Sequence, residues 1–148
     1  MPPQAGRKVV FDSNIYIHAI RSGPAGREYK LLVNSLPFTY LSSVVSAELY
    51  LGALDSLGVR LVQGFVERSE RVGRIVTPTH ASWNEAGGIL GKITREEPAL
   101  KSKFPILFND ILIAFCALQI GANVYTKDEE DFRLIRRFKR FGLVIVSA

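Results

Sequence analysis

The fold of this chain is decided by the stretch KVVFDSN, residues 8–14. Val9–Phe11 form a short apolar run of residues that favour β-strands, and Asp12 follows at once. Ser13 and Asn14 favour turns and helix N-caps, and the residues after them suit a helix. A strand therefore ends at Asp12, and in an open parallel sheet ligands bind outside the carboxyl ends of the strands. Asp12 is either a site carboxylate or the cap of the helix, and this stretch alone favours neither interpretation.

Segments typical of strands and of helices alternate along the rest of the chain. Strands are predicted at residues 9–11, 38–42, 74–78, 123–126 and 142–146, and helices at 27–36, 44–57, 59–69, 105–121 and 131–141, with another after Thr79. This alternation predicts the α/β class, with a mainly parallel central sheet between helices in a three-layer α/β/α sandwich. We expect residues 1–148 to form one domain. Trp83 recurs at helical spacing with apolar residues and is predicted to lie in the core.

Composition bounds the location and the partners. No apolar run reaches the ~18–20 residues of a membrane helix, residues 1–7 lack the apolar core of a signal peptide, and the single cysteine, Cys116, suits a reducing compartment. We therefore expect a cytoplasmic protein without a membrane segment. The net charge of +5 is a weak argument for a polyanionic partner. Residues 96–104 are predicted to be a loop, and its Lys101 and Lys103 could touch a substrate.

Two acidic residues stand out on predicted helices. Glu48 has apolar residues or glycine at its i±3 and i±4 positions, and a buried carboxylate is usually paired or binds metal. The alternative is a side chain at the edge of the apolar stripe that reaches solvent. Asp110 follows Asn109 at the start of helix 105–121, where it either complements the helix dipole or, if Asn109 is the cap, points at something else.

A run of acids, KDEEDF at residues 127–132, follows the strand at 123–126. Packing does not explain four acids at the end of a strand, although a solvated loop that begins a helix would. In that alternative Asp131 is only the N-cap of the helix. Asp12 and Asp128 thus follow strands, while Glu48 and Asp110 lie on helices, and a parallel sheet allows all four to converge at one edge.

Such a convergence requires a cation. Two carboxylates ~5 Å apart repel by roughly 3 kcal/mol at an effective dielectric constant of about 20, which corresponds to about two pKa units. Oxygen ligands without His or Cys suit Mg²⁺ or Mn²⁺. Acidic sites that hold these ions recur in enzymes that hydrolyse phosphodiesters.

At this point the sequence resembles the PIN-domain nucleases. The resemblance covers nearly the whole chain and is carried, in order, by VVFDSN at 9–14, SAEL at 46–49, NDILIA at 109–114 and TKDEEDF at 126–132. It implies that one or two Mg²⁺ or Mn²⁺ ions are bound by the catalytic acids Asp12, Glu48, Asp110 and Asp128. It also implies that Ser13, Asn14 and Thr126 order the site. Asp131 could replace or assist Asp128, because the last loop varies within the family.

A stand-alone domain of this length resembles the VapC-type toxins. That resemblance implies a homodimeric endoribonuclease inhibited by a cognate antitoxin. A cluster of basic side chains near the end of the chain is either an RNA-binding surface or a solvated helix face, and it comprises Arg133, Arg136, Arg137, Lys139 and Arg140.

Other functions remain open at this stage. A phosphatase of the haloacid dehalogenase type needs a second Asp two residues after the first, where this chain has Asn14. A non-catalytic module that binds RNA or protein is the main alternative, and the presence of all four acids argues against it. An RNA-processing nuclease outside toxin–antitoxin pairs is a closer alternative.

Overall fold

The computed structural model describes residues 7–147, and residues 1–6, which bear on the expectation of no signal peptide, lie outside that range. Its centre is a five-stranded sheet in which all the paired neighbours are parallel, in the order β3-β2-β1-β4-β5. The strands are β1 (Val9–Phe11), β2 (Thr39–Ser42), β3 (Ile75–Val76), β4 (Asn123–Thr126) and β5 (Gly142–Ile145). β1 is buried throughout, as its unbroken apolar run predicts. It lies in the middle of the sheet, so Asp12 leaves from the centre of the carboxyl edge.

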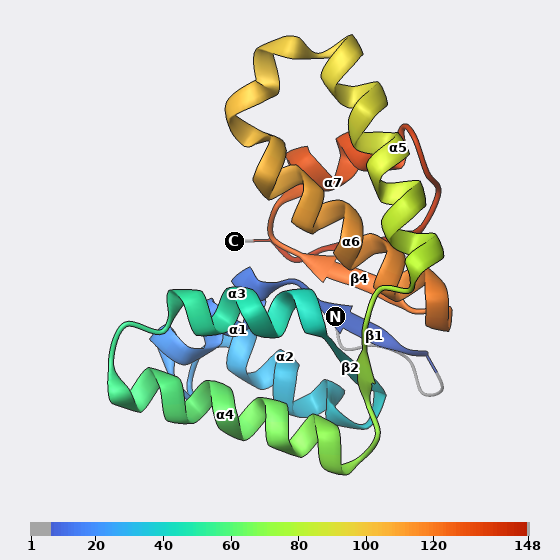
Figure 1. Ribbon diagram of the computed structural model, residues 1–148. Coiled ribbons are helices and arrows are strands. Elements are labelled where there is room, and N and C mark those ends of the chain that lie inside the picture. The colour runs from blue at the N-terminus through green and yellow to red at the C-terminus, as the bar shows by residue number, and fades with distance from the viewer. Residues whose placement is uncertain (1–6, 148) are drawn as a thin grey trace.

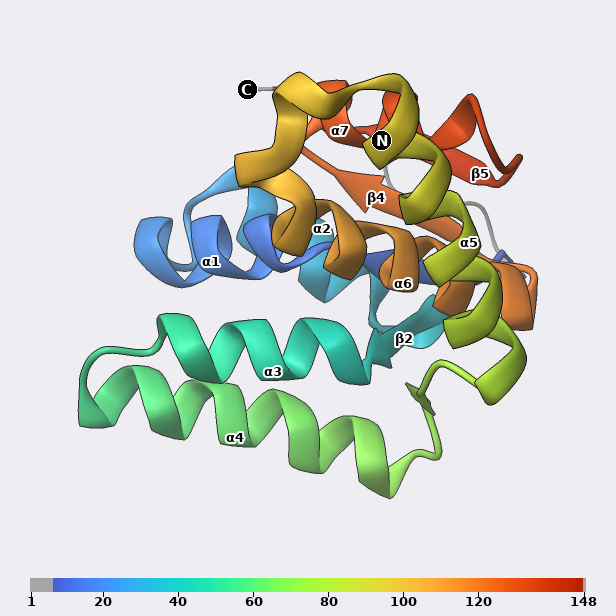
Figure 2. The same cartoon turned by 45° about the horizontal axis from the view of Figure 1, so that its top comes forward.

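Within residues 7–147, seven α-helices cover the sheet. They are α1 (Ser13–Ser22), α2 (Arg27–Ser35), α3 (Ser43–Gly52), α4 (Ser56–Arg71), α5 (His80–Glu96), α6 (Phe104–Ile120) and α7 (Glu129–Arg136), with 3₁₀ helices η1 (Leu36–Phe38) and η2 (Pro98–Lys103). In Figure 1, α1 to α4 lie below the sheet and α5 to α7 above it. Figure 2 shows α3 and α4 as a hairpin beside the rest of the domain. The three-layer α/β/α prediction is confirmed.

Helix α6 is the core helix. Its residues 110–117 are all buried, and it packs against β1, β4, α3 and α5. It ends at Gly121, whose φ of 68° is the left-handed conformation that glycine adopts without strain. Together with η2 it forms a segment, Pro98–Ile120, that is long and apolar enough to cross a membrane by length and composition alone. Burial inside the domain accounts for that composition.

Several predicted boundaries are wrong. The predicted loop 96–104 contains η2, so α6 begins at Phe104 and Asp110 lies in its second turn rather than at its start. The predicted helix 44–57 ends at Gly52, and α4 begins at Ser56 because Asp55 caps it by accepting from the Gly58 N–H at 2.7 Å. Helix α7 spans Glu129–Arg136 instead of 131–141.

Trp83 is not a core residue. Its side chain is 48% exposed, and its ring lies 5.5 Å from that of Phe108 on α6. The residue therefore covers the groove between α5 and α6 from outside. Helical spacing identifies a face of a helix, but it does not say how deeply each position on that face is buried.

Candidate functional site

Asp12 is held rigidly at the carboxyl end of β1. Its Oδ1 accepts from the Ser13 N–H at 2.7 Å, and its Oδ2 accepts from the Thr126 hydroxyl at 2.7 Å. Its backbone N–H donates to the Tyr125 carbonyl of β4 at 2.9 Å. Asp12 is thus the N-cap of α1 and also a buried carboxylate at the sheet edge, so the capping interpretation is confirmed and the role of Asp12 in a site stays a prediction. Burial raises the pKa of this carboxyl, and its hydrogen bonds oppose that rise.

Thr126 connects this corner to the loop after β4. While its hydroxyl donates to Asp12, its oxygen accepts from the Asn14 side-chain amide at 3.3 Å and from the Asp128 N–H at 3.0 Å. The Asn14 side-chain oxygen accepts from the Lys127 N–H at 3.3 Å. These contacts fix the β4–α7 loop relative to β1. Ser13, Asn14 and Thr126 therefore lie where residues that order the site would be needed, and that role remains a prediction.

Glu48 and Asp110 each bury a carboxylate oxygen that has no partner. By donor–acceptor geometry, neither Oε1 of Glu48 nor Oδ2 of Asp110 has a hydrogen-bond donor among the described residues, although the Ser13 side chain lies near enough to Glu48 to lower its pKa. The other oxygen of Glu48 is 3.5 Å from the Asn109 side-chain nitrogen. Asn109 therefore supports Glu48 instead of capping α6. A buried acceptor without a partner is costly, which indicates that something absent from the protein itself completes this site.

Burial and charge act together on these two carboxyls. Burial raises the pKa of Asp110 to about 9, and the carboxylates of Asp12, Asp128, Glu48 and Asp131 add to the rise in that order. The pKa of Glu48 is also raised, first by burial and then by the charge of Asp12. Without a cation, the Asp110 carboxyl is therefore protonated at neutral pH. A bound cation would reverse this preference.

Asp128 and Asp131 complete the cluster at the start of α7. One carboxylate oxygen from each of Asp110, Asp128 and Asp131 lies within 4.8 Å of the other two. Asp128, rather than Asp131, is the N-cap of α7, because its Oδ1 accepts from the Asp131 N–H at 3.1 Å. Burial raises the pKa of Asp128 to about 6. Asp131 is buried and pairs with Lys103, whose Nζ is 2.7 Å from Asp131 Oδ1.

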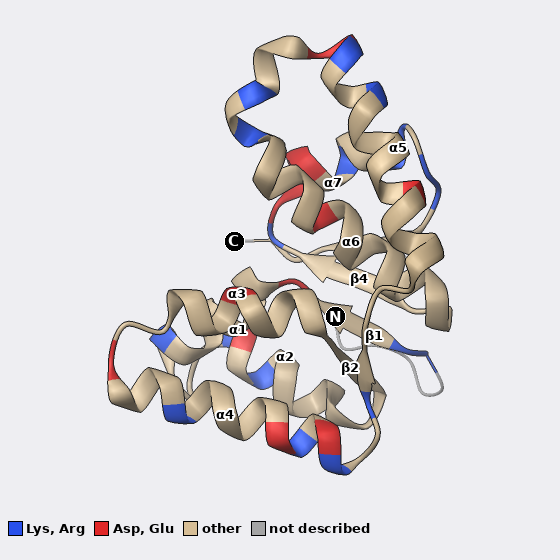
Figure 3. Ribbon diagram, viewed as in Figure 1, with Lys and Arg blue, Asp and Glu red and all other residues tan. Residues whose placement is uncertain are grey.

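The structure thus brings the five predicted acids to the carboxyl end of the sheet, where the charges of Asp12, Glu48, Asp128 and Asp131 all act on Asp110. In Figure 3, red segments lie directly after β1 and on α3, α6 and α7. We name Asp12, Glu48, Asp110, Asp128 and Asp131 the acid cluster. Its donors are oxygens alone, and two of them are buried without a partner. Both properties fit a hard divalent cation such as Mg²⁺ or Mn²⁺. Lys103 is the residue that the sequence analysis did not place here, although it had identified the basic segment that carries it.

The basic residues at the end of α7 form a separate surface. Five of them line a shallow hollow with Phe138, namely Arg133, Arg136, Arg137, Lys139 and Arg140. Three already have acidic partners: Arg133 bonds Glu129 at 2.6 Å, Lys139 bonds Glu85 at 2.8 Å, and Arg137 lies 3.9 Å from Glu97. The net positive charge of this surface is therefore smaller than its sequence implies.

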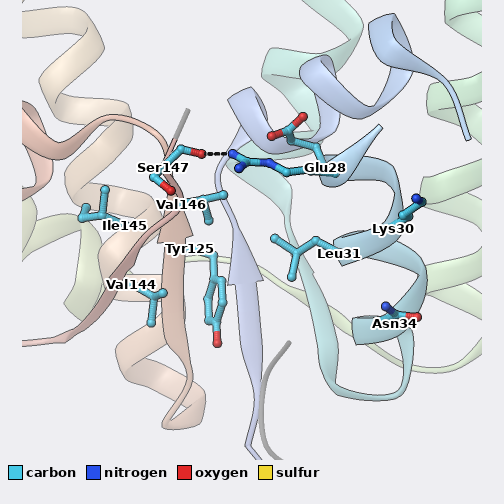
Figure 4. A pocket seen from close by; sticks show the side chains of 10 residues that line it. Glu28, Lys30, Leu31, Asn34, Tyr125, Val144, Ile145, Val146 and Ser147 are labelled. Atoms are coloured by element: carbon cyan, nitrogen blue, oxygen red, sulfur yellow. Dashed lines mark hydrogen bonds between the residues drawn. The ribbon is translucent and has the colours of Figure 1, made fainter. Parts of the chain in front are cut away.

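A pocket of about 470 Å³ lies elsewhere, between α2 and the strands β4 and β5 (Figure 4). Tyr125 and Val144 are among the residues that line it, and Arg27, which also lines it, donates to the Ser147 carbonyl. Beside it, Lys127 bonds Glu28 at 3.1 Å. These contacts hold the segment after β5 against α2. None of the acid cluster lines this pocket, so it is distinct from the candidate site.

Comparison with known proteins identifies the fold. The family model described as PIN domain matches residues 9–137. A chain of the DNA-bound VapBC structure from Salmonella typhimurium has a TM-score of 0.67 at 23% identity, with 94% of this chain and 98% of that chain covered. For FitAcB from Neisseria gonorrhoeae the TM-score is 0.60 at 25% identity, with 91% and 95% covered. For DNA-bound VapBC2 from Rickettsia felis it is 0.62 at 20% identity, with 94% and 98% covered. No curated protein matches the chain in sequence.

Proposed function

Because this chain belongs to the PIN-domain family, we propose that it is a metal-dependent endoribonuclease and the toxin of a toxin–antitoxin pair. The observation that carries this proposal is the acid cluster with its two buried, unpartnered oxygens on Glu48 and Asp110. Acids placed only for solubility or capping would reach solvent or a donor. The solved structures of VapBC and FitAcB share the fold of this chain and support the toxin assignment.

Asp12, Glu48, Asp110 and Asp128 would hold the metal ion, with Asp131 beside them. Mg²⁺ or Mn²⁺ bound there would neutralise charge on the scissile phosphate and lower the pKa of the attacking water. The protein contributes fixed geometry: Thr126 and the Ser13 N–H hold both oxygens of Asp12, so that carboxylate needs no reorganisation. The unpartnered oxygens of Glu48 and Asp110 are already buried away from solvent.

Water, rather than a side chain, is the proposed nucleophile. Among the described residues, Cys116 is buried in α6 and its thiol hydrogen-bonds with the Ser42 hydroxyl, so it is not available for attack. In-line attack by water that expels the 3′-oxygen leaves a 5′-phosphate and a 3′-hydroxyl. A 2′,3′-cyclic phosphate would instead report attack by the 2′-hydroxyl of the RNA.

Substrate and partners follow from the surface. The basic residues Arg133, Arg136, Arg137, Lys139 and Arg140 are proposed to contact RNA phosphates, with Arg136 and Arg140 exposed. The tip of the α3–α4 hairpin exposes three leucines: Leu51 is 84% exposed, Leu54 94% and Leu57 59%. We name these the leucine tip. Exposed apolar side chains that lie together mark protein contacts, and we propose that a cognate antitoxin covers them. The protein would act as a homodimer in the cytoplasm.

The test is cleavage of defined RNAs by the purified full chain. Whole tRNA, ribosomal RNA and a single-stranded RNA should be incubated with Mn²⁺, with Mg²⁺ and with EDTA, and the ends of the products mapped. We expect cleavage only with metal, 5′-phosphate ends, and no cleavage by Asp12→Asn or Asp110→Asn. RNA binding should survive in both variants, which separates the chemistry from the basic surface. Binding without cleavage by the metal-loaded wild type would favour a non-catalytic RNA-binding module.

A further inference from the structure

Lys103 is the cation that the protein itself supplies to the acid cluster. Within residues 7–147, its bond to Asp131 at 2.7 Å is the one ion pair made by any of the five acids. Lys103 is the last residue of η2 and directly precedes α6, the helix that carries Asp110. The ammonium therefore belongs to the residue directly before the core helix α6, which carries the Asp110 carboxylate of the cluster.

The acid cluster consequently has two unlike ends. At one end, Glu48 Oε1 and Asp110 Oδ2 are buried and lack any donor among the described residues. At the other end, Asp131 is equally buried but its Oδ1 is already neutralised by Lys103. Asp110 and Asp128 each bring an oxygen within 4.8 Å of one from Asp131, so the two ends are adjacent. An added cation is therefore needed most at the part of the acid cluster that contains Glu48 and Asp110.

The ammonium of Lys103 already bonds Oδ1 of Asp131 at 2.7 Å, so a second metal ion at this oxygen would lie directly beside a positive charge. Two cations this close repel strongly in a site of low dielectric constant. A second divalent ion would have to displace Lys103 and leave its charge without the partner that it has in the folded protein. The remaining N–H donors of the ammonium stay free for solvent or for a phosphate oxygen, since the Lys103 side chain is 37% exposed.

We propose that Lys103 takes the place of a second metal ion, so that the site binds one divalent cation and pairs it with a fixed ammonium. This inference rests on the proposed function only in assuming that the acid cluster binds metal. It assigns Asp131 to Lys103 and not to the metal ion. It also predicts that removing the ammonium, with Asp131 left in place, opens a second cation position.

The test is the number of Mn²⁺ ions bound per chain, measured without RNA by isothermal titration calorimetry and by the loss of free Mn²⁺ signal in electron paramagnetic resonance. We expect one ion for the wild type and two for Lys103→Gln, the second weaker. The double variant Lys103→Gln with Asp131→Asn should return to one ion, because it lacks both the ammonium and the carboxylate. Lys101→Gln is the matched control, since it removes an exposed lysine from the same 3₁₀ helix, and it should bind one ion.

Two ions in the wild type would overturn the inference and leave the metal-dependent function intact, and this measurement needs no variant to fold. One ion in a folded Lys103→Gln would also overturn it. No bound Mn²⁺ in the wild type would overturn the proposed metal dependence, and the inference with it. Far-ultraviolet circular dichroism shows whether each variant is folded.

Discussion

Replacing Asp110 by Asn should stabilise the metal-free protein at neutral and alkaline pH. The folded protein keeps a proton on Asp110 up to about pH 9, whereas the unfolded chain releases it near 3.8. The folded state therefore binds the extra proton. The stability that this proton contributes is fully present below about pH 4 and is lost as pH rises toward 9. Asn is nearly isosteric with the protonated acid and does not titrate, so Asp110→Asn should escape this loss.

The magnitude follows from the two pKa values. Their difference of about five units corresponds to roughly 7 kcal/mol of unfolding free energy at about 1.4 kcal/mol per unit. Roughly 4 kcal/mol of this contribution is lost by pH 7. These are upper figures, because water entry and relaxation reduce the penalty of a buried charge. We expect Asp110→Asn to be more stable than wild type by a few kcal/mol at pH 8 in EDTA, and by little at pH 5.

The assay is urea unfolding in EDTA at pH 5, 6.5 and 8, followed by circular dichroism. Glu67→Gln removes an exposed acid from α4 and should follow the wild type at each pH. Adding Mn²⁺ should reverse the order, because a metal ion stabilises only the protein that retains the carboxylate. Equal pH dependence in wild type and Asp110→Asn would refute the reasoning. A loss of several kcal/mol in the variant would show that Asp110 has a structural partner.

Three further predictions concern the metal, the support of Asp12 and the partner surface. Saturating Mn²⁺ at about 100 times its Kd should stabilise the wild type by roughly 2.7 kcal/mol; an equal rise in melting temperature for Asp12→Asn would count against the site. Thr126→Val removes the donor to Asp12 Oδ2 and should cost roughly 1–3 kcal/mol of unfolding free energy; unchanged stability would mean that water replaces the hydroxyl. Leu54→Lys should weaken antitoxin binding measured by calorimetry while RNA cleavage stays at the wild-type rate; if it instead dissolves a homodimer, the leucine tip is a contact between two copies.

The positions of the acids were largely predictable because they lie next to or within apolar runs, where a charged side chain is unusual. Asp12 and Asp128 follow strands whose apolar residues identify them, and Glu48 interrupts an apolar stripe, so each position is visible within a few residues of sequence. Parallel strands then fix the shared edge without any knowledge of the loops. The convergence of the acids follows from this logic, and the structure shows it.

What the sequence could not show depends on contacts between distant segments. Lys103, at the end of η2, pairs with Asp131, which lies 28 residues later in the sequence. Asp128 rather than Asp131 caps α7, and its N–H donates to the Thr126 hydroxyl, a contact that the acidic run itself does not reveal. The exposure of Trp83 depends on how far α6 extends beside α5, and helical spacing carries no such information.

The hydrogen bonds of Thr126 also determine the stage of folding at which the site can form. Thr126 and Asp12 lie 114 residues apart in sequence, although β1 and β4 are neighbours in the sheet. Long-range parallel pairing of this kind forms late in folding, because the intervening chain must first be ordered. During synthesis the ribosome must therefore release nearly the whole domain before Asp12 meets Asp128. A nascent chain that stops after β3 has Asp12 and Glu48 and lacks the other three acids of the cluster, so the proposed cleavage of RNA would begin only after the domain is complete.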